Sequence, residues 1–168
     1  MNWNELKAYF GMAEQEGDAS VRYTARLISD MLKDPINYLY FHFLSPVVTE
    51  FEKVNGYFQA TNIDADELVQ QLHLFYKSFT GRVYNRNGDA LAVDNVDFGG
   101  KFIFEAMNLI KNSGNDGDVI TKVNEAKGRC HSMLLEAASQ LKKHLPTSQD
   151  MFRRLASVSP SFTDSESG

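Results

Sequence analysis

The stretch PINYLYFHFLSPVVTEFEKVNGYF, residues 35–58, decides the fold. Its apolar side chains recur every three or four residues, which is the period of an α-helix. Aromatic side chains widen this stripe until the first half is apolar on nearly every side, which is typical of a helix buried inside a domain. Pro46 lies within the pattern and removes one backbone hydrogen bond. We therefore expect one long, buried helix with a kink at Pro46, or two shorter helices that meet there.

Similar apolar stripes predict helices on both sides of this segment. The first begins near Trp3 and ends at Gly11. The second carries its stripe from Val21 to Leu32 and ends at Asp34, because the residue before a proline avoids the α-helical conformation. Further helices are expected near residues 64–83, 98–110, 119–145 and 148–156. Together the patterns predict an all-α, bundle-like domain of six to seven helices.

The helix at 119–145 has the most regular pattern. We expect its inward face to include four residues, Val123, Cys130, Met133 and Leu134. Charged and polar residues occupy the other side, and Glu125 is spaced to pair with Arg129 one turn later.

Residues 82–93 contain the clearest turn. An irregular loop is expected around Asn87-Gly88, because an isolated hairpin is only marginally stable. The alternative is a small two-stranded β-hairpin over 82–93, since Asn87-Gly88 suits a type I′ turn.

Length and composition describe one globular chain. With 168 residues, of which 43% are hydrophobic, it can bury a core without disulfides or a metal. We expect a single helical domain over residues 1–156 and a mobile, Ser-rich tail at 157–168. The longest uncharged apolar run, Ile36–Val48, has 13 residues, whereas a membrane span needs about 20. No transmembrane segment is therefore predicted.

The cysteine content and the N-terminus indicate the compartment. Cys130 is the only cysteine, which excludes a disulfide framework and a multi-cysteine zinc site. The first residues, Met1-Asn2-Trp3, resemble neither a signal peptide nor an Arg-rich transit peptide. We therefore expect an intracellular protein, with neither a metal nor a small-molecule cofactor.

Charge is distributed unevenly along the chain. The net charge is −5, but residues 119–156 hold seven Lys or Arg and only three Asp or Glu. A local basic segment is where a phosphate backbone binds, since each neutralised phosphate releases a counterion. The candidate DNA-binding residues, which would make sequence-independent phosphate contacts, are Lys122, Lys127, Arg129, Lys142, Lys143, Arg153 and Arg154. The alternative is a solvated helix face.

Residue pairs that could carry catalysis are few. Cys130 and His131 are adjacent, so on a helix they point about 100° apart and cannot share a proton. Asp94 and Asp97 could bind a metal as a pair, as in a metal-assisted nuclease, but helix capping explains both without a cation. No glycine-rich phosphate loop, nucleophile elbow or zinc-protease motif occurs. The sequence therefore predicts no catalytic site.

Four segments share a scattered pattern of apolar residues and prolines. They are LKDPxNYLYFxFLxPVVxEFxKVNxxFQ at 32–59, Trp3-x-x-Leu6-x-x-Tyr9-Phe10, Leu72-x-x-Phe75-Tyr76-Lys77-Ser78-Phe79 and Leu141-Lys142-Lys143-His144-Leu145-Pro146. Together they resemble the transposases of the hAT superfamily and the host proteins domesticated from them. The resemblance extends from Trp3 to Pro160, over nearly the whole chain.

The resemblance implies a helical scaffold without catalytic residues. In that family a helical region is inserted into an RNase H-like catalytic domain. Two catalytic Asp residues and an Arg-Trp motif precede the insertion, and a catalytic Glu and a dimerisation segment follow it. None of these matches a position here, because Asn2 precedes Trp3 and Glu166 lies in the Ser-rich tail. The resemblance thus implies a nuclear, non-enzymatic helical domain of the kind that in relatives supports the catalytic core and helps to hold transposon-end DNA. The charge pattern adds that any DNA contact of this chain is expected in the basic segment 119–156.

A helical protein-interaction module without DNA binding is the alternative function. Residues 1–84 carry a net charge of −4, and the chain is rich in aromatic residues. An exposed apolar patch would support this alternative. Its partner would be another protein or a second copy of the chain.

Overall fold

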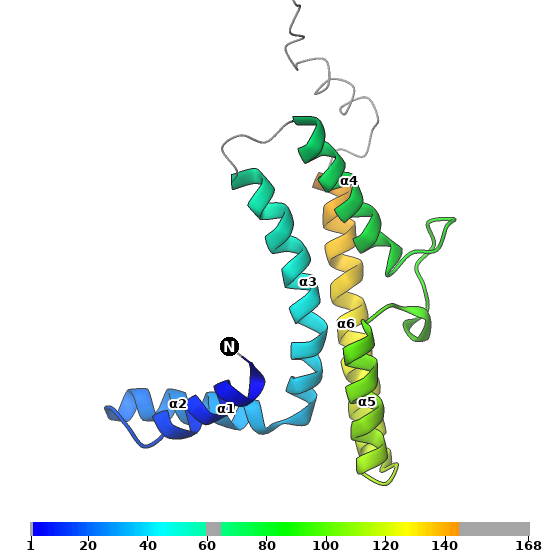
Figure 1. Cartoon of the computed structure of the whole chain (residues 1–168). Helices are drawn as coiled ribbons and strands as arrows, with labels where there is room; N and C mark the ends of the chain where they lie inside the picture. Colours follow the sequence, from blue (N-terminus) through cyan, green and yellow to red (C-terminus); the bar gives the residue numbers. More distant parts are fainter. Residues whose placement is uncertain (1, 60–64, 145–168) are drawn as a thin grey trace, which may run out of the picture. The chain divides into compact units, whose positions relative to one another are not determined.

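The computed structural model describes residues 2–59 and 65–144, and it confirms the all-α fold (Figure 1). In chain order the elements are α1 (Trp3–Ala13), α2 (Ala19–Lys33), α3 (Pro35–Gln59), α4 (Ala65–Gly81), the 3-10 helix η1 (Val93–Asn95), α5 (Gly100–Asn112) and α6 (Gly117–His144). The helix expected at 148–156 and the tail at 157–168 lie outside the described residues.

Side-chain caps explain where the first two helices begin. Asn2 accepts a hydrogen bond from the backbone N–H of Glu5 at 3.0 Å, and the Glu5 carboxylate accepts one from the backbone N–H of Asn2 at 2.9 Å. This reciprocal pair is a capping box. Asp18 caps α2 by accepting from the N–H groups of Ser20 and Val21, both at 2.9 Å. The predicted stop at Gly11 is wrong, because a glycine can remain helical and α1 continues to Ala13.

Helix α3 is continuous through its internal proline. It begins at Pro35, as the Asp34-Pro35 sequence predicts, and runs to Gln59, so the alternative of two shorter helices is wrong. Leu39, Phe43 and Val47 form its buried stripe. Other apolar residues of α3 are exposed, so the helix is buried along one side only. Packing of this stripe maintains the helix although Pro46 lacks the amide hydrogen.

The described residues form two compact units. Unit 1 contains residues 2–47 and 97–131, and unit 2 contains residues 48–59, 65–96 and 132–144. In unit 1, an aromatic cluster joins α3 to α5: Phe43 lies 6.3 Å from Phe102 and 6.4 Å from Phe98, ring centre to ring centre. Phe98 and Phe102 are 5.2 Å apart, and all three rings are buried.

Unit 2 has its own aromatic core. Phe51 of α3 meets Phe75 and Phe79 of α4 edge-to-face, with ring centres 4.9 and 5.6 Å apart. Arg82, just after α4, forms an ion pair with Glu50 of α3. The contacts of these residues hold α3 against α4 within this unit.

Residues 82–92 form an irregular loop, as expected, and the alternative of a two-stranded hairpin is wrong. Tyr84 and Ala90 make one isolated antiparallel bridge, and no strand occurs among the described residues. The N–H of Gly88 donates to the carbonyl of Asn85 at 3.1 Å, and Gly88 alone in this turn has a positive φ, of 87°. A type I′ turn needs two such residues, so the turn is not of this type.

Candidate functional site

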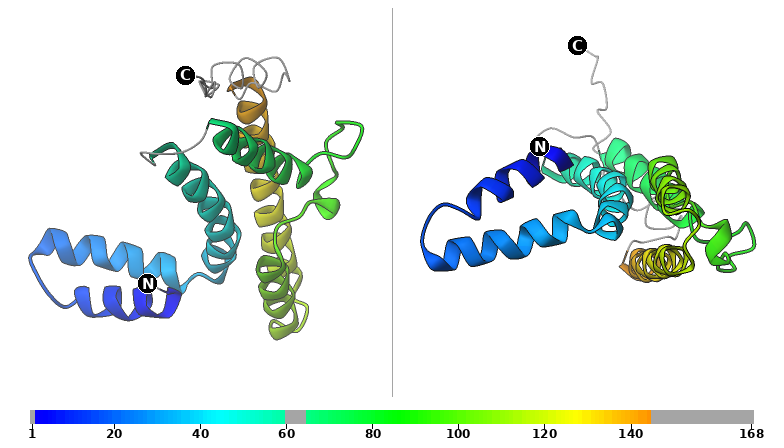
Figure 2. Two further views of the ribbon diagram at one scale, coloured as in Figure 1. Left: turned by 45° about the horizontal axis from the view of Figure 1, so that its top comes forward. Right: turned by 90° about the horizontal axis from the view of Figure 1, so that it is seen from below.

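Helices α1 and α2 lie antiparallel and side by side in unit 1 (Figure 2). The turn between them contains Gly17, whose φ is +86°. A Cβ at this position would lie 3.1 Å from a methyl carbon of Val21, so both the backbone conformation and the space favour glycine. This turn sets the spacing of the two helices.

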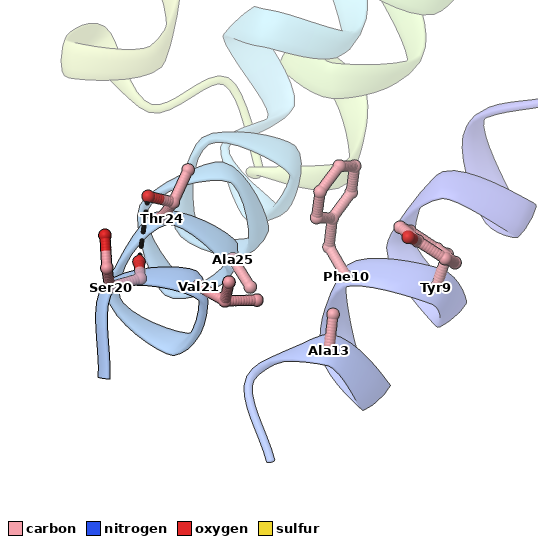
Figure 3. A pocket seen from close by; sticks show the side chains of 7 residues that line it. All are labelled: Tyr9, Phe10, Ala13, Ser20, Val21, Thr24 and Ala25. Carbon is pink, nitrogen blue, oxygen red and sulfur yellow. Dashed lines mark hydrogen bonds between the residues drawn. The ribbon is translucent and has the colours of Figure 1, made fainter. Parts of the chain in front are cut away.

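An open apolar groove lies between the two helices (Figure 3). Its volume is about 270 Å³, and it is lined by Tyr9, Phe10, Ala13, Ser20, Val21, Thr24 and Ala25. An adjoining pocket of about 360 Å³ shares Tyr9, Ala13 and Val21 and extends to Met12 and Glu16. The Thr24 hydroxyl donates to the Ser20 carbonyl at 3.0 Å, so this polar group is satisfied within the helix.

Several side chains around this groove are exposed within the part of the chain that the structure describes. Tyr9, Met12 and Val21 are 51–61% exposed. No residue of α1 is buried, although this helix is rich in apolar side chains. Contiguous exposed apolar residues on a folded protein mark interaction surfaces more often than isolated ones do. The α1–α2 groove is therefore the candidate site.

An aromatic cluster fixes the beginning of α1 to α3. The ring centre of Trp3 lies 5.3 Å from that of Tyr38 and 5.2 Å from that of Phe41. His42 meets Tyr38 edge-to-face at 4.3 Å. Burial lowers the pKa of His42, and the nearby charge of Lys101 lowers it further. His42 is thus part of the packing that joins α1 to α3.

The basic residues of α6 do not share a single face of the helix. Lys122 and Arg129 are exposed on one face, whereas Lys127 is half-buried on another. Lys142 and Lys143 are exposed in unit 2, while the first three belong to unit 1. Arg153 and Arg154 lie outside the described residues.

Acidic residues share the exposed face of α6 with Lys122 and Arg129. The ammonium nitrogen of Lys122 lies 2.6 Å from the Asp118 carboxylate, and this hydrogen bond raises the pKa of Lys122. Glu125 is exposed on the same face, but its predicted pair with Arg129 is absent from the ion pairs of the described residues. In all, α6 has five Lys or Arg and three Asp or Glu. This face is therefore mixed in charge, with a modest basic excess.

The residues considered for catalysis lie in structural positions. Asp97 accepts a hydrogen bond from the N–H of Gly99 at 2.9 Å, immediately before α5, and Asp94 lies in η1. The expectation that both cap a helix is wrong, because the N-cap residues of η1 and α5 are Ala92 and Gly99, and neither helix has a side-chain cap. Cys130 is buried, and this burial raises the pKa of its thiol to about 12, which makes it unreactive at neutral pH. Within residues 2–59 and 65–144, no three His, Cys, Asp or Glu side chains come together as a metal site.

Two further findings bear on function. In the part of the chain that the structure describes, every helix is too short or too polar to cross a membrane. No family model, curated protein or solved structure matches this chain.

Proposed function

We propose that this chain is a non-catalytic helical interaction domain whose α1–α2 groove binds an apolar segment of another protein. The observation that carries the proposal is the exposure of Tyr9, Met12 and Val21 around an open groove. Covering such side chains removes apolar surface from water, and each Å² of apolar surface buried contributes about 25 cal/mol of favourable free energy.

The shape of the groove favours a helical partner. Two antiparallel helices with an apolar groove between them can accept the apolar face of a third, amphipathic helix. Glu16 lines the pocket beside Met12, so a Lys or Arg at the edge of the partner helix would complement it. The expected ligand is therefore a short amphipathic helix with a basic flank.

Site-specific photocrosslinking tests this proposal. The photoreactive residue p-benzoylphenylalanine would replace Met12 in one variant and Met107 in a control. Met107, on α5, is the same residue type with a similar exposure of 66%, but it does not line the groove. We expect a discrete crosslinked protein from position 12 alone, and its loss when Tyr9→Glu is added. Equal crosslinking from both positions would contradict the proposal.

A second proposed function is sequence-independent DNA contact through α6, in the nucleus. It is supported by the exposed Lys122 and Arg129 and by the resemblance to the helical insertion of hAT transposases. On this proposal the chain derives from such a transposase and keeps its scaffold role. The mixed charge of the α6 face gives it less support than the groove gives to protein binding.

A gel-shift series over salt concentration tests the DNA contact. If Lys122 and Arg129 each neutralise a phosphate, replacing both with Ala lowers the slope of log K against log salt by about 2. Lys77→Ala, on α4, is the control for loss of a surface charge elsewhere. No shift even at low ionic strength would rule the contact out. Imaging of the tagged full chain tests the nuclear location separately.

A further inference from the structure

The chain contains two Asn-Gly pairs, and the structure places them in contrasting surroundings. Asn55-Gly56 lies inside α3, whereas Asn87-Gly88 lies at the tip of the loop that follows α4 (Figure 1). Asparagine is chemically least stable before glycine, because glycine has no side chain to hinder the attack of its own backbone nitrogen on the preceding amide. Both pairs have the same reacting groups, so a difference in their stability comes from the fold.

The loop tip leaves Asn87-Gly88 accessible to solvent. Every residue from Asn85 to Ala90 is exposed. The side-chain amide of Asn87 makes no hydrogen bond within the described part of the chain. The N–H of Gly88 donates to the carbonyl of Asn85 at 3.1 Å, but an exposed turn bond of this kind opens easily because water replaces the lost partner. Both groups needed for the reaction are therefore available.

The base of the loop is anchored, so the tip can open while the fold stays intact. Val83 is fully buried, and its carbonyl accepts a hydrogen bond from the N–H of Leu91 at 2.8 Å. Tyr84 and Ala90 form the antiparallel bridge just above. Opening at Gly88 is therefore a local event that does not require α4 to unfold.

The helix protects Asn55-Gly56. Inside an α-helix the backbone N–H of Gly56 is bonded to the carbonyl four residues earlier, and the helix also fixes the backbone dihedral of Asn55 that ring closure must change. Freeing this nitrogen requires the end of α3 to unwind, which breaks several hydrogen bonds together. We therefore expect the reaction to be slow at Asn55.

We propose that Asn87 is a site of spontaneous deamidation. The Gly88 backbone nitrogen loses its proton to solvent base and attacks Cγ of Asn87, so a C–N bond forms and the side-chain amide leaves as ammonia. Water then opens the five-membered succinimide. Addition at the side-chain carbonyl gives aspartate, and addition at the main-chain carbonyl gives isoaspartate, in which the backbone passes through the former side chain. The loop does not line the α1–α2 groove, so the inference is independent of the proposed function.

The products change the hydrogen bonds and the charge of the turn. The side-chain oxygen of Asn85 accepts from the backbone N–H groups of Asn87 and Asp89, both at 2.9 Å. Isoaspartate adds one carbon to the backbone between these two donors, so this arrangement is lost. Either product also places a new carboxylate near Asp89, and the two like charges repel. Deamidation thus loosens the tip of the loop.

Peptide mapping by mass spectrometry tests the proposal on the full folded chain after incubation at mildly alkaline pH. Methyl transfer by an isoaspartyl-specific methyltransferase identifies the isoaspartate product. We expect Asn87 to be converted at least about tenfold faster than Asn55. In guanidinium chloride the two rates should converge, because the protection by α3 is then removed.

Two variants separate the chemistry of Asn87 from that of the rest of the chain. Asn87→Gln keeps a side-chain amide but needs a larger ring, so conversion at this position should nearly cease. Asn55→Gln is the matched control and leaves conversion of Asn87 unchanged. Circular dichroism checks that each variant is folded. A folded chain in which Asn87 reacts no faster than Asn55 overturns the proposal, and so does an Asn87 that stays intact when folded although both pairs react in denaturant.

Discussion

Phe102→Ala is the substitution expected to destabilise this fold most clearly. Phe102 is fully buried in α5, and its ring lies 5.2 Å from Phe98 and 6.3 Å from Phe43, centre to centre. Removing a buried phenylalanine ring costs about 3–5 kcal/mol, from lost burial and from the cavity left behind. For a chain of this size, that loss lowers the melting temperature by on the order of 10 °C.

Phe104 provides the control for this prediction, two residues away on the same helix. It is 59% exposed, so Phe104→Ala should change the free energy of unfolding by less than about 0.5 kcal/mol. Urea unfolding followed by circular dichroism measures both variants. Comparable losses would refute the assigned orientation of α5. The difference between the two variants also tests whether this segment is helical, because residues two apart share a face on a strand but lie on different faces of a helix.

Three further measurements check other parts of the structure. Burial lowers the pKa of His42, so as the pH falls the imidazole takes up a proton in the unfolded chain before it does so in the folded one. The free energy of unfolding should therefore fall as the pH drops below about 6.5. This fall should be smaller in His42→Gln. Cys130, with a thiol pKa of about 12, should react with Ellman's reagent in denaturant but hardly at all in the folded chain. Gly88→Ala should lower the free energy of unfolding by about 1 kcal/mol, because the φ of Gly88 is +87°. Gly56→Ala should raise the free energy of unfolding by about 0.5–1 kcal/mol, because Gly56 lies inside α3 with nothing within 4 Å of its Cβ position. Urea unfolding measures both.

Local chemistry in the sequence predicts several helix ends and core residues correctly. Asp34-Pro35 separates α2 from α3 because the proline restricts both its own backbone and that of its neighbour. On α6, Val123, Cys130 and Leu134 are buried as the period requires. Met133 is exposed, because it lies about 100° from Leu134 at the edge of the stripe. Whether a residue at the edge of a stripe is buried or exposed depends on how far the neighbouring helices cover it.

The candidate site could not be identified from the sequence for the same reason. The apolar residues of α2 read as a single inward stripe from Val21 to Leu32. In the structure Ala25 and Leu32 are buried, while Leu27 and Met31 are exposed. A helix with two apolar sides gives no local signal of which side another helix covers. Which side is covered depends on the helix that packs against it. Contacts between distant parts of the chain determine which helix that is.

The absence of buried residues in α1 has a consequence for amide hydrogen exchange. A helix that buries little is held mainly by its own hydrogen bonds and by its cap, so it opens more readily than the core helices. Its amides should therefore exchange with deuterium faster than those of α5, where Phe102 and Ala106 are buried. A partner in the groove would slow this exchange, and part of its binding free energy would be consumed in ordering α1. Protection of α1 would then report occupancy of the groove without any label.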